Sequence, residues 1–182
     1  MSRTARDNQR SKVYRAERVI HTYDADKAEY KTLEECMEFA QKVLRDPKVL
    51  EAYPIAANIA TKLRLRPGQG KRRATAESWI CTIKLPRWAR QKTVICHELA
   101  HLLTPDAEAH GWEFCECYLL LVRREVGPEA SETLRKSFKQ WKVRYTPPRK
   151  KRTFTEEQRQ ALRERMQGIN AAKKPPQPPE SP

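Results

Sequence analysis

The sequence predicts an α+β fold in which a helix that carries a candidate site packs on a small, mostly antiparallel β-sheet, and the C-terminal half is helical. Two observations support this prediction. Apolar residues recur with helical spacing through most of the second half of the chain, whereas residues 62–85 alternate apolar and polar side chains around a turn that contains Pro and Gly. The 182 residues, 38% hydrophobic and 33% charged, suit one compact domain with tails.

The N-terminal third predicts one strand and one well-delimited helix. Residues 12–20 alternate loosely between apolar and polar side chains and are predicted to form a strand. A helix is predicted to follow Thr32, because Thr32-Leu-Glu-Glu35 matches a capping box in which the hydroxyl caps the first turn and Glu35 bonds back. The pair Asp46-Pro47 either ends this helix or starts a short second turn.

A β-hairpin is predicted next. Residues 62–66 read KLRLR, so one face of the strand is buried and the other is positive. Residues 67–70 read PGQG and supply the turn signal. The return strand is predicted over residues 78–85, which places apolar side chains on one buried face: Trp79, Cys81, Ile83 and Leu85.

Three helices are predicted in the second half, over residues 89–103, 110–126 and 128–143. Pro105 stops the first helix or starts the next one, and Gly127-Pro128 separates the second helix from the third. Beyond residue 148, a short helix is predicted over residues 155–167. Its many Arg, Gln and Glu residues favour a solvated, frayed helix.

The formal net charge of +14 is densest toward the two ends of the chain. We therefore predict three parts: a disordered basic arm (1–11), a folded domain (12–146) and a basic, Pro-rich, mostly disordered tail (147–182). Such a charge indicates one of two things. Either the basic surface is simply solvated, or the protein prefers polyanions, including nucleic acid, and acidic surfaces as partners.

The five cysteines are an odd number, and no apolar run follows the basic N-terminus. Both observations argue against a secretory signal and a disulfide framework, so the cysteines are predicted to be reduced and mostly packed thiols. No stretch approaches the roughly 20 apolar residues that a membrane span needs. The predicted location is the cytoplasm, with no membrane partner.

Three of the four histidines lie within fourteen residues of one another, and two of them form the pattern H-E-x-x-H. His97 and His101 are four residues apart, so on a helix they lie on one face, one turn apart, and can bind a single Zn²⁺ ion. Glu98 would project beside the metal, where it can take a proton from a zinc-bound water. The alternative is a buried helix whose histidines only satisfy hydrogen bonds.

A catalytic zinc site needs a third protein ligand and one open position. His110 is the first candidate, because Pro105 breaks the chain and a residue at the start of the next helix can fold back over the first. Glu113 is the second candidate, in a two-His-one-Glu arrangement, and Glu108 is another rival. The alternative for His110 is a helix-capping or surface histidine.

Residues 97–114, HELAHLLTPDAEAHGWEF, resemble the HExxH…HGxxF signature of a family of actinobacterial and phage-borne zinc metallohydrolases. The resemblance covers about residues 13–143, and a more distant one is to SprT-like zinc metalloproteases. It implies a small zincin-like fold, one zinc ion on His97, His101 and His110, and general-base duty for Glu98. Unlike many SprT-like proteins, this chain has no C-terminal zinc-ribbon cysteines.

Three functional hypotheses follow. The first is a zinc hydrolase, by preference a metallopeptidase that acts on an unidentified protein or peptide, with Glu98 as general base. The second is a DNA-associated SprT-like protease that basic patches recruit to nucleic acid. The third is a non-catalytic, zinc-stabilised binding module. Four residues are candidates for stabilising the oxyanion: Tyr118, Arg123, Arg124 and Tyr145.

Overall fold

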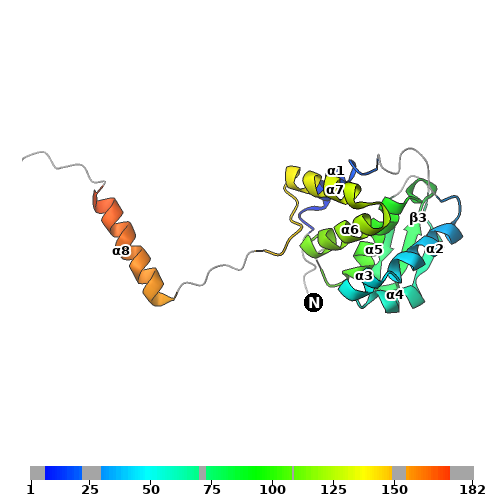
Figure 1. Cartoon of the computed structure of the whole chain (residues 1–182), viewed down its shortest axis with the longest axis horizontal. Helices are drawn as coiled ribbons and strands as arrows, with labels where there is room; N and C mark the ends of the chain where they lie inside the picture. Colours follow the sequence, from blue (N-terminus) through cyan, green and yellow to red (C-terminus); the bar gives the residue numbers. More distant parts are fainter. Residues whose placement is uncertain (1–6, 22–29, 70–72, 108, 149–154, 173–182) are drawn as a thin grey trace, which may run out of the picture. The chain divides into compact units, whose positions relative to one another are not determined.

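A computed structural model describes residues 7–21, 30–69, 73–107, 109–148 and 155–172 of the chain (Figure 1). The chain divides into two compact units, Met1–Pro147 and Pro148–Pro182. The first unit combines helices with one small sheet, so the predicted α+β class and the helical second half are confirmed.

Seven α-helices of the first unit are described, together with two 3₁₀ turns and three strands. The helices are α1 (Arg10–Glu17), α2 (Leu33–Leu44), α3 (Pro47–Ala52), α4 (Ala56–Lys62), α5 (Lys92–Leu103), α6 (Trp112–Glu125) and α7 (Pro128–Gln140). The 3₁₀ turns are η1 (Ser78–Ile80) and η2 (Arg87–Ala89). The strands are β1 (Arg64–Pro67), β2 (Thr75–Glu77) and β3 (Thr82–Leu85).

The sheet has the order β1-β3-β2, which corrects the predicted hairpin. Strand β1 pairs with β3 in parallel, with Leu65 opposite Ile83, and β2 pairs with β3 antiparallel, with Ala76 opposite Ile83. The sheet is therefore mixed rather than mostly antiparallel. Residues 75–77 form the antiparallel partner of β3, so β1 pairs with the other edge of β3.

The predicted return strand over residues 78–85 is only half correct. Residues 78–80 form the turn η1, which ends at Cys81 in the left-handed region with φ of 48°. The period-2 alternation therefore begins only after this turn. Ile83 and Leu85 are fully buried as predicted, whereas Trp79 is 85% exposed instead of facing the core.

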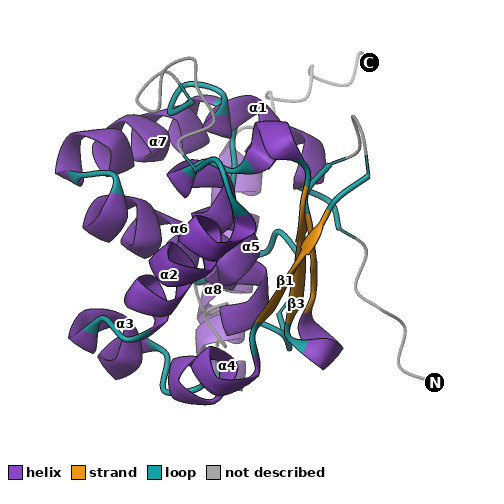
Figure 2. Ribbon diagram, turned by 90° about the vertical axis from the view of Figure 1, so that its right-hand side faces the viewer, coloured by secondary structure: helices purple, strands orange, loops and turns teal. Residues whose placement is uncertain are grey.

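The helices lie on one face of the sheet, as Figure 2 shows. Helix α5 contacts β2 and α6, and α2 contacts β1, so α5 lies in the middle of the unit with the sheet on one side and α6 on the other. Helix α6 packs in turn on α7, and α7 on α1. This central place buries most of α5, including His97 and Glu98, and gives their side chains a fixed environment.

Residues 12–20, predicted to form a strand, are mostly helical in α1. Val13, Ala16 and Ile20 are fully buried, and their spacing of three and four residues fits a helix packed on α7 better than alternation. The arm predicted over 1–11 is likewise corrected at its end. Residues 1–6 lie outside the described residues, but residues 7–11 are ordered, and Gln9 is buried.

The two helix starts predicted from the sequence are confirmed. The Thr32 hydroxyl accepts a hydrogen bond from the Glu35 backbone N–H, and the Glu35 carboxylate accepts from the Thr32 N–H, which completes the capping box of α2. Asp46 caps the N-terminus of α3 by accepting from the Lys48 N–H, and Pro47 occupies the first turn.

The second unit contains helix α8 (Glu156–Ala172), which is longer than the predicted 155–167. The side chains of residues 156–167 are exposed, as expected of a solvated helix. The basic run 149–152 and the proline-rich end after residue 172 lie outside the described residues. Within the described part of the chain, we find no helix with the length and apolar character to cross a membrane.

Gln9→Ala should lower the free energy of unfolding by about 2–3 kcal/mol, because three hydrogen bonds are lost at a buried position. The Gln9 amide nitrogen donates to the His110 carbonyl over 2.7 Å and to the Arg144 carbonyl over 3.1 Å, and its oxygen accepts from the Arg144 N–H over 2.8 Å. Urea unfolding of wild type and variant measures the difference. The exposed Gln140→Ala on α7 is the matched control, and equal losses in the two variants would contradict the assignment.

Candidate metal centre

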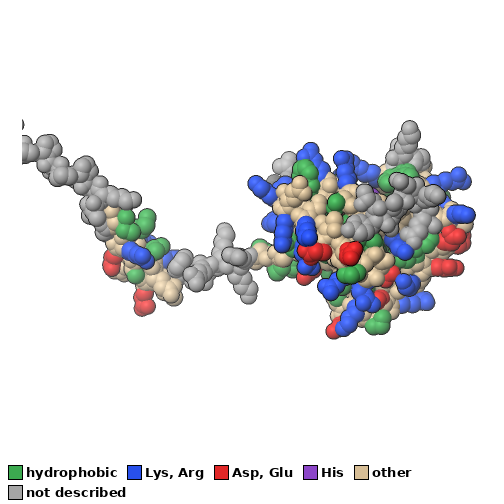
Figure 3. Space-filling view, turned by 45° about the horizontal axis from the view of Figure 1, so that its top comes forward, with side chains coloured by type: hydrophobic (Ala, Val, Ile, Leu, Met, Phe, Trp, Pro, Cys, Tyr) green, Lys and Arg blue, Asp and Glu red, His purple; other side chains and the backbone are tan. Residues whose placement is uncertain are grey.

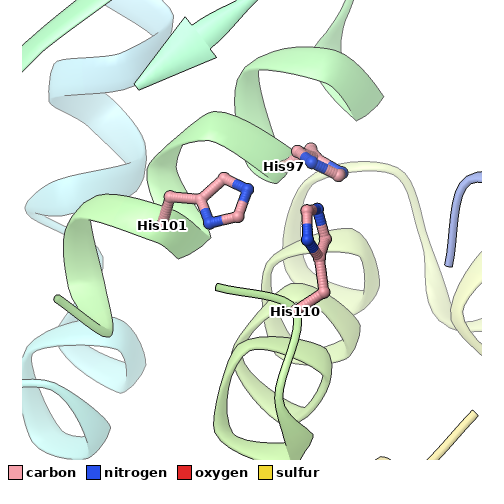
Figure 4. A group of neighbouring side chains, drawn as sticks. All are labelled: His97, His101 and His110. Atoms are coloured by element: carbon pink, nitrogen blue, oxygen red, sulfur yellow. The ribbon is translucent and has the colours of Figure 1, made fainter. Parts of the chain in front are cut away.

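Three histidine rings converge on one point beside α5 (Figure 4). His97 and His101 project from α5, one turn apart, and His110 reaches them from the segment just before α6. One ring nitrogen of each can be chosen so that all three lie within 4.8 Å of one another. His97 and His110 are buried and His101 is half-buried. The predicted trio is thus brought together by the fold.

Two carboxylates from the N-terminal segment orient two of these rings. Glu17 Oε2 lies 2.8 Å from His97 Nδ1, and Asp7 Oδ2 lies 2.7 Å from His110 Nδ1. An ionised carboxylate only accepts hydrogen bonds, so each Nδ1 carries a hydrogen, and in the neutral form of each ring the Nε2 atom keeps its lone pair. Metal-binding histidines in proteins are commonly held by such carboxylates.

The Nε2 atoms of His97 and His110 are buried and have no hydrogen-bond partner among the residues that the structure describes. A buried polar atom without a partner costs about 1–3 kcal/mol, which folded proteins rarely leave uncompensated. A metal ion at the point where the rings converge would satisfy both atoms. The site therefore fits a metal by the chemistry of its donors and by the unpaired state of two of them.

Burial and mutual proximity keep most of the cluster uncharged. Burial, and then the neighbouring His97 and His110, lower the pKa of His101 to about 2. Burial also lowers the pKa of His110, although its hydrogen bond with Asp7 opposes the shift. For His97, burial acts in the same direction, but the Glu17 carboxylate outweighs it and the pKa is raised. Neutral imidazole is the form that binds metals.

Glu98 lies beside the cluster and is almost fully buried. Burial, reinforced by the Glu17 carboxylate and opposed by His97, raises its pKa to about 7. A hydrogen bond from the Ala76 backbone also acts on the Glu98 carboxylate and links it to strand β2. A carboxyl group with a pKa near neutrality can both accept and return a proton, which is the property required of a general base.

Two hollows border Tyr14. The first, about 340 Å³, borders His101, His110 and Glu98 and is bounded by β2. The second, about 380 Å³, borders His97 and Glu98 and is lined on its apolar side by Trp88, Val94 and Tyr118. Both hollows share Tyr14, Arg73, Ala74 and Glu98, so the cluster and its acid face one divided cleft.

Aromatic rings hold the histidines from both sides. Phe114 stacks on His101 with ring centroids 4.3 Å apart, and Tyr14 stacks on His97 at 5.5 Å. Burial, and then the carboxylates of Glu98 and Glu17, raise the pKa of Tyr14, so its hydroxyl stays protonated at neutral pH. Phe114 is the aromatic residue of the H-G-x-x-F pattern, and this spacing places its ring against His101.

The rival ligands do not join the cluster. Among the described residues, the potential metal-binding group at this point consists of the three histidines, without Glu113. Glu108 lies outside the described residues. All five cysteines are free, and four of them are buried, as predicted. Burial raises the pKa of Cys36 to about 11 and of Cys117 to about 12, which leaves these thiols protonated and inert.

The four candidates for stabilising the oxyanion either lie away from the histidine cluster or already bond other groups. The buried Tyr118 hydroxyl donates to the Thr93 carbonyl. Arg124 bonds Asp46 on the surface. Arg123 and Tyr145 line a separate hollow between α6 and α7. None of the four borders the hollow that contains His101 and His110.

The contribution of the N-terminal segment is not predicted from the sequence, because the loose alternation in residues 12–20 favours a strand. A signal was present: Asp7, Arg10, Tyr14 and Glu17 are spaced by three and four residues, which is one face of a helix. All four contact or border the site.

Comparison of the chain with models of protein families, with curated proteins and with solved structures finds no match in any of the three.

Glu17→Gln should weaken metal affinity about 10- to 100-fold, because the His97 ring loses the charged acceptor that orients it. Competition of the protein with a chromophoric chelator for zinc measures the affinity. Glu38→Gln, an exposed charge on α2, is the matched control and should leave the affinity unchanged. Equal affinities for wild type and Glu17→Gln would show that the carboxylate plays no part in metal binding.

Proposed function

We propose that this protein is a zinc-dependent hydrolase and, more specifically, a metallopeptidase. One observation carries the proposal: three histidine rings converge beside the buried carboxyl group of Glu98, and two of their Nε2 atoms have no hydrogen-bond partner among the described residues. Three histidine ligands with a position left open are typical of catalytic zinc, whereas structural sites are closed by four protein ligands. The resemblance of residues 97–114 to zinc metallohydrolases points the same way.

In this proposal His97, His101 and His110 hold the zinc ion. When bound, zinc supplies Lewis-acid activation of a water molecule and of the substrate carbonyl. The Glu98 carboxylate would accept a proton from the water as its oxygen adds to the substrate carbonyl, and would pass that proton to the amine nitrogen as the C–N bond breaks. Glu17 and Asp7 keep the two Nδ1 atoms protonated and the rings in place throughout.

Strand β2 supplies a place for an extended substrate. Its Thr75 and Ala76 border the hollow that contains His101, His110 and Glu98. Within the described residues β2 pairs on one side only, with β3. An extended peptide can therefore add to its other edge through the main-chain groups that the hydrogen bond from Ala76 to Glu98 leaves open, and present a peptide bond to Glu98.

A non-catalytic zinc module is the less favoured alternative. A purely structural site would need a fourth protein ligand, and the described residues around this cluster offer three histidines. It would also leave unexplained why a titratable carboxyl group, Glu98, is buried against the cluster with access to a hollow.

The proposal predicts about one zinc per chain in the wild type and its loss, or a sharp fall, in His110→Ala, because two ligands bind zinc much more weakly than three. Elemental analysis of the purified proteins measures the content. His21→Ala is the matched control, since His21 is the one remaining histidine and lies outside the cluster.

A metal-loaded Glu98→Gln should lose at least about 100-fold in peptide hydrolysis while retaining zinc. Undiminished hydrolysis in this variant would refute the role of Glu98.

A second function, binding of single-stranded nucleic acid, is favoured by one specific feature. Trp79 is 85% exposed and lines a hollow of about 630 Å³ together with Lys62 and Arg64. An exposed ring can stack on a base while the cations contact phosphates. Elsewhere the basic charge is dispersed: on the face drawn in Figure 3, Lys and Arg side chains are spread over the sheet-containing unit with acidic side chains among them.

Trp79→Ala should weaken binding of a fluorescent oligothymidylate about tenfold, because base stacking contributes roughly 1–3 kcal/mol per base. Fluorescence anisotropy across a salt series measures the affinity and its salt dependence. Trp141→Ala is the matched control, since Trp141 is also exposed but packs under Arg15 on another surface. Absence of binding by the wild type near physiological salt would remove this second function.

A further inference from the structure

Two arginines lie at the mouth of the first hollow, on the ring of Tyr14. The guanidinium carbon of Arg73 lies 4.7 Å from the centroid of this ring, and that of Arg10 lies 5.8 Å from it. Arg10 comes from the first turn of α1, whereas Arg73 precedes β2, so only the folded chain brings them to the same aromatic side chain. Both border the hollow that contains His101, His110 and Glu98.

No carboxylate of the described residues forms an ion pair with this pair of arginines. The two acids of the same hollow are engaged elsewhere: Asp7 binds His110 Nδ1 through one oxygen and the Arg10 backbone N–H through the other, and Glu98 is buried beside the histidines. Two cations on one ring repel each other, and an anion between them would relieve the repulsion.

The space beside the arginines suits a small side chain with a carboxylate. Small residues line the wall of the hollow, among them Ala74, Ala76, Ala107 and Ala109. They leave a volume of about 340 Å³ that continues from the arginines to the histidine cluster. Guanidinium groups bind carboxylates through paired N–H···O bonds, so a carboxylate can be recognised by direction as well as by charge.

We propose that the cleft selects peptides with an acidic side chain next to the scissile bond, and that Arg10 and Arg73 receive its carboxylate. This inference rests on the proposed zinc hydrolase function and names its substrate class. The peptide lies along β2 with its carbonyl at the histidine cluster, and the acidic side chain occupies the first hollow. Tyr14 holds both guanidinium groups at the rim, since they pack on its ring.

The test compares two zinc-directed ligands, the hydroxamates of N-acetyl-glutamate and N-acetyl-glutamine, which differ only by a side-chain carboxylate in place of an amide. Isothermal titration calorimetry on the zinc-loaded full chain measures binding without any turnover. The glutamate compound should bind about tenfold more tightly, and the difference should shrink as salt is raised. Arg10→Gln and Arg73→Gln should each remove several-fold of this preference without changing the affinity of the glutamine compound.

Arg15→Gln is the matched control. It removes the same charge from the same helix, but its guanidinium lies over Trp141 and not in the hollow, so the preference should persist. Equal binding of the two hydroxamates by the wild type overturns the acidic preference and leaves the zinc centre intact. A preference that survives in the Arg10→Gln/Arg73→Gln double variant overturns its assignment to these arginines. Binding of neither ligand to a chain that holds one zinc overturns the hydrolase proposal and this inference together.

Discussion

The contact between the N-terminal segment and the histidine cluster is the interaction on which the site depends. Glu17 and Asp7 hold His97 and His110 through their Nδ1 atoms, across 80 and 103 residues of sequence. Contacts of buried carboxylates add little net stability, because desolvation offsets most of the attraction, but loss of one partner leaves an uncompensated group. These contacts therefore serve mainly to orient the two histidine rings. The packing of α1 on α7 offsets their cost in free energy.

The same contact sets the electrostatics of the cleft. Glu17 is buried, yet its pKa is lowered because His97 outweighs the effect of burial, so it stays ionised. Its charge contributes in turn to raising the pKa of Glu98. Glu17 thus stays ionised as a hydrogen-bond acceptor, whereas Glu98 titrates near neutrality. Two acids with pKa values pushed apart by their surroundings are the usual basis of a division of roles in an active site.

The cleft combines a rigid floor with a charged rim. Its floor is α5, which lies between the sheet and α6, and its wall is the edge strand β2. The rim carries Arg10 and Arg73, which the ring of Tyr14 keeps together. The N-terminal helix therefore contributes both an orienting acid and a rim cation, and couples the support of the histidines to the entrance of the cleft.

Local signals in the sequence determined much of this protein. The capping box at Thr32, the helix that carries H-E-x-x-H and the three histidines were all predictable, because caps and helical spacing act within a few residues. Tertiary structure alone decided the rest. The parallel pairing of β1 with β3, the exposure of Trp79 and the placing of Asp7, Arg10, Tyr14 and Glu17 at the site depend on which distant segments pack together. No local pattern encodes that choice, because it follows from burying all apolar faces of the chain at once.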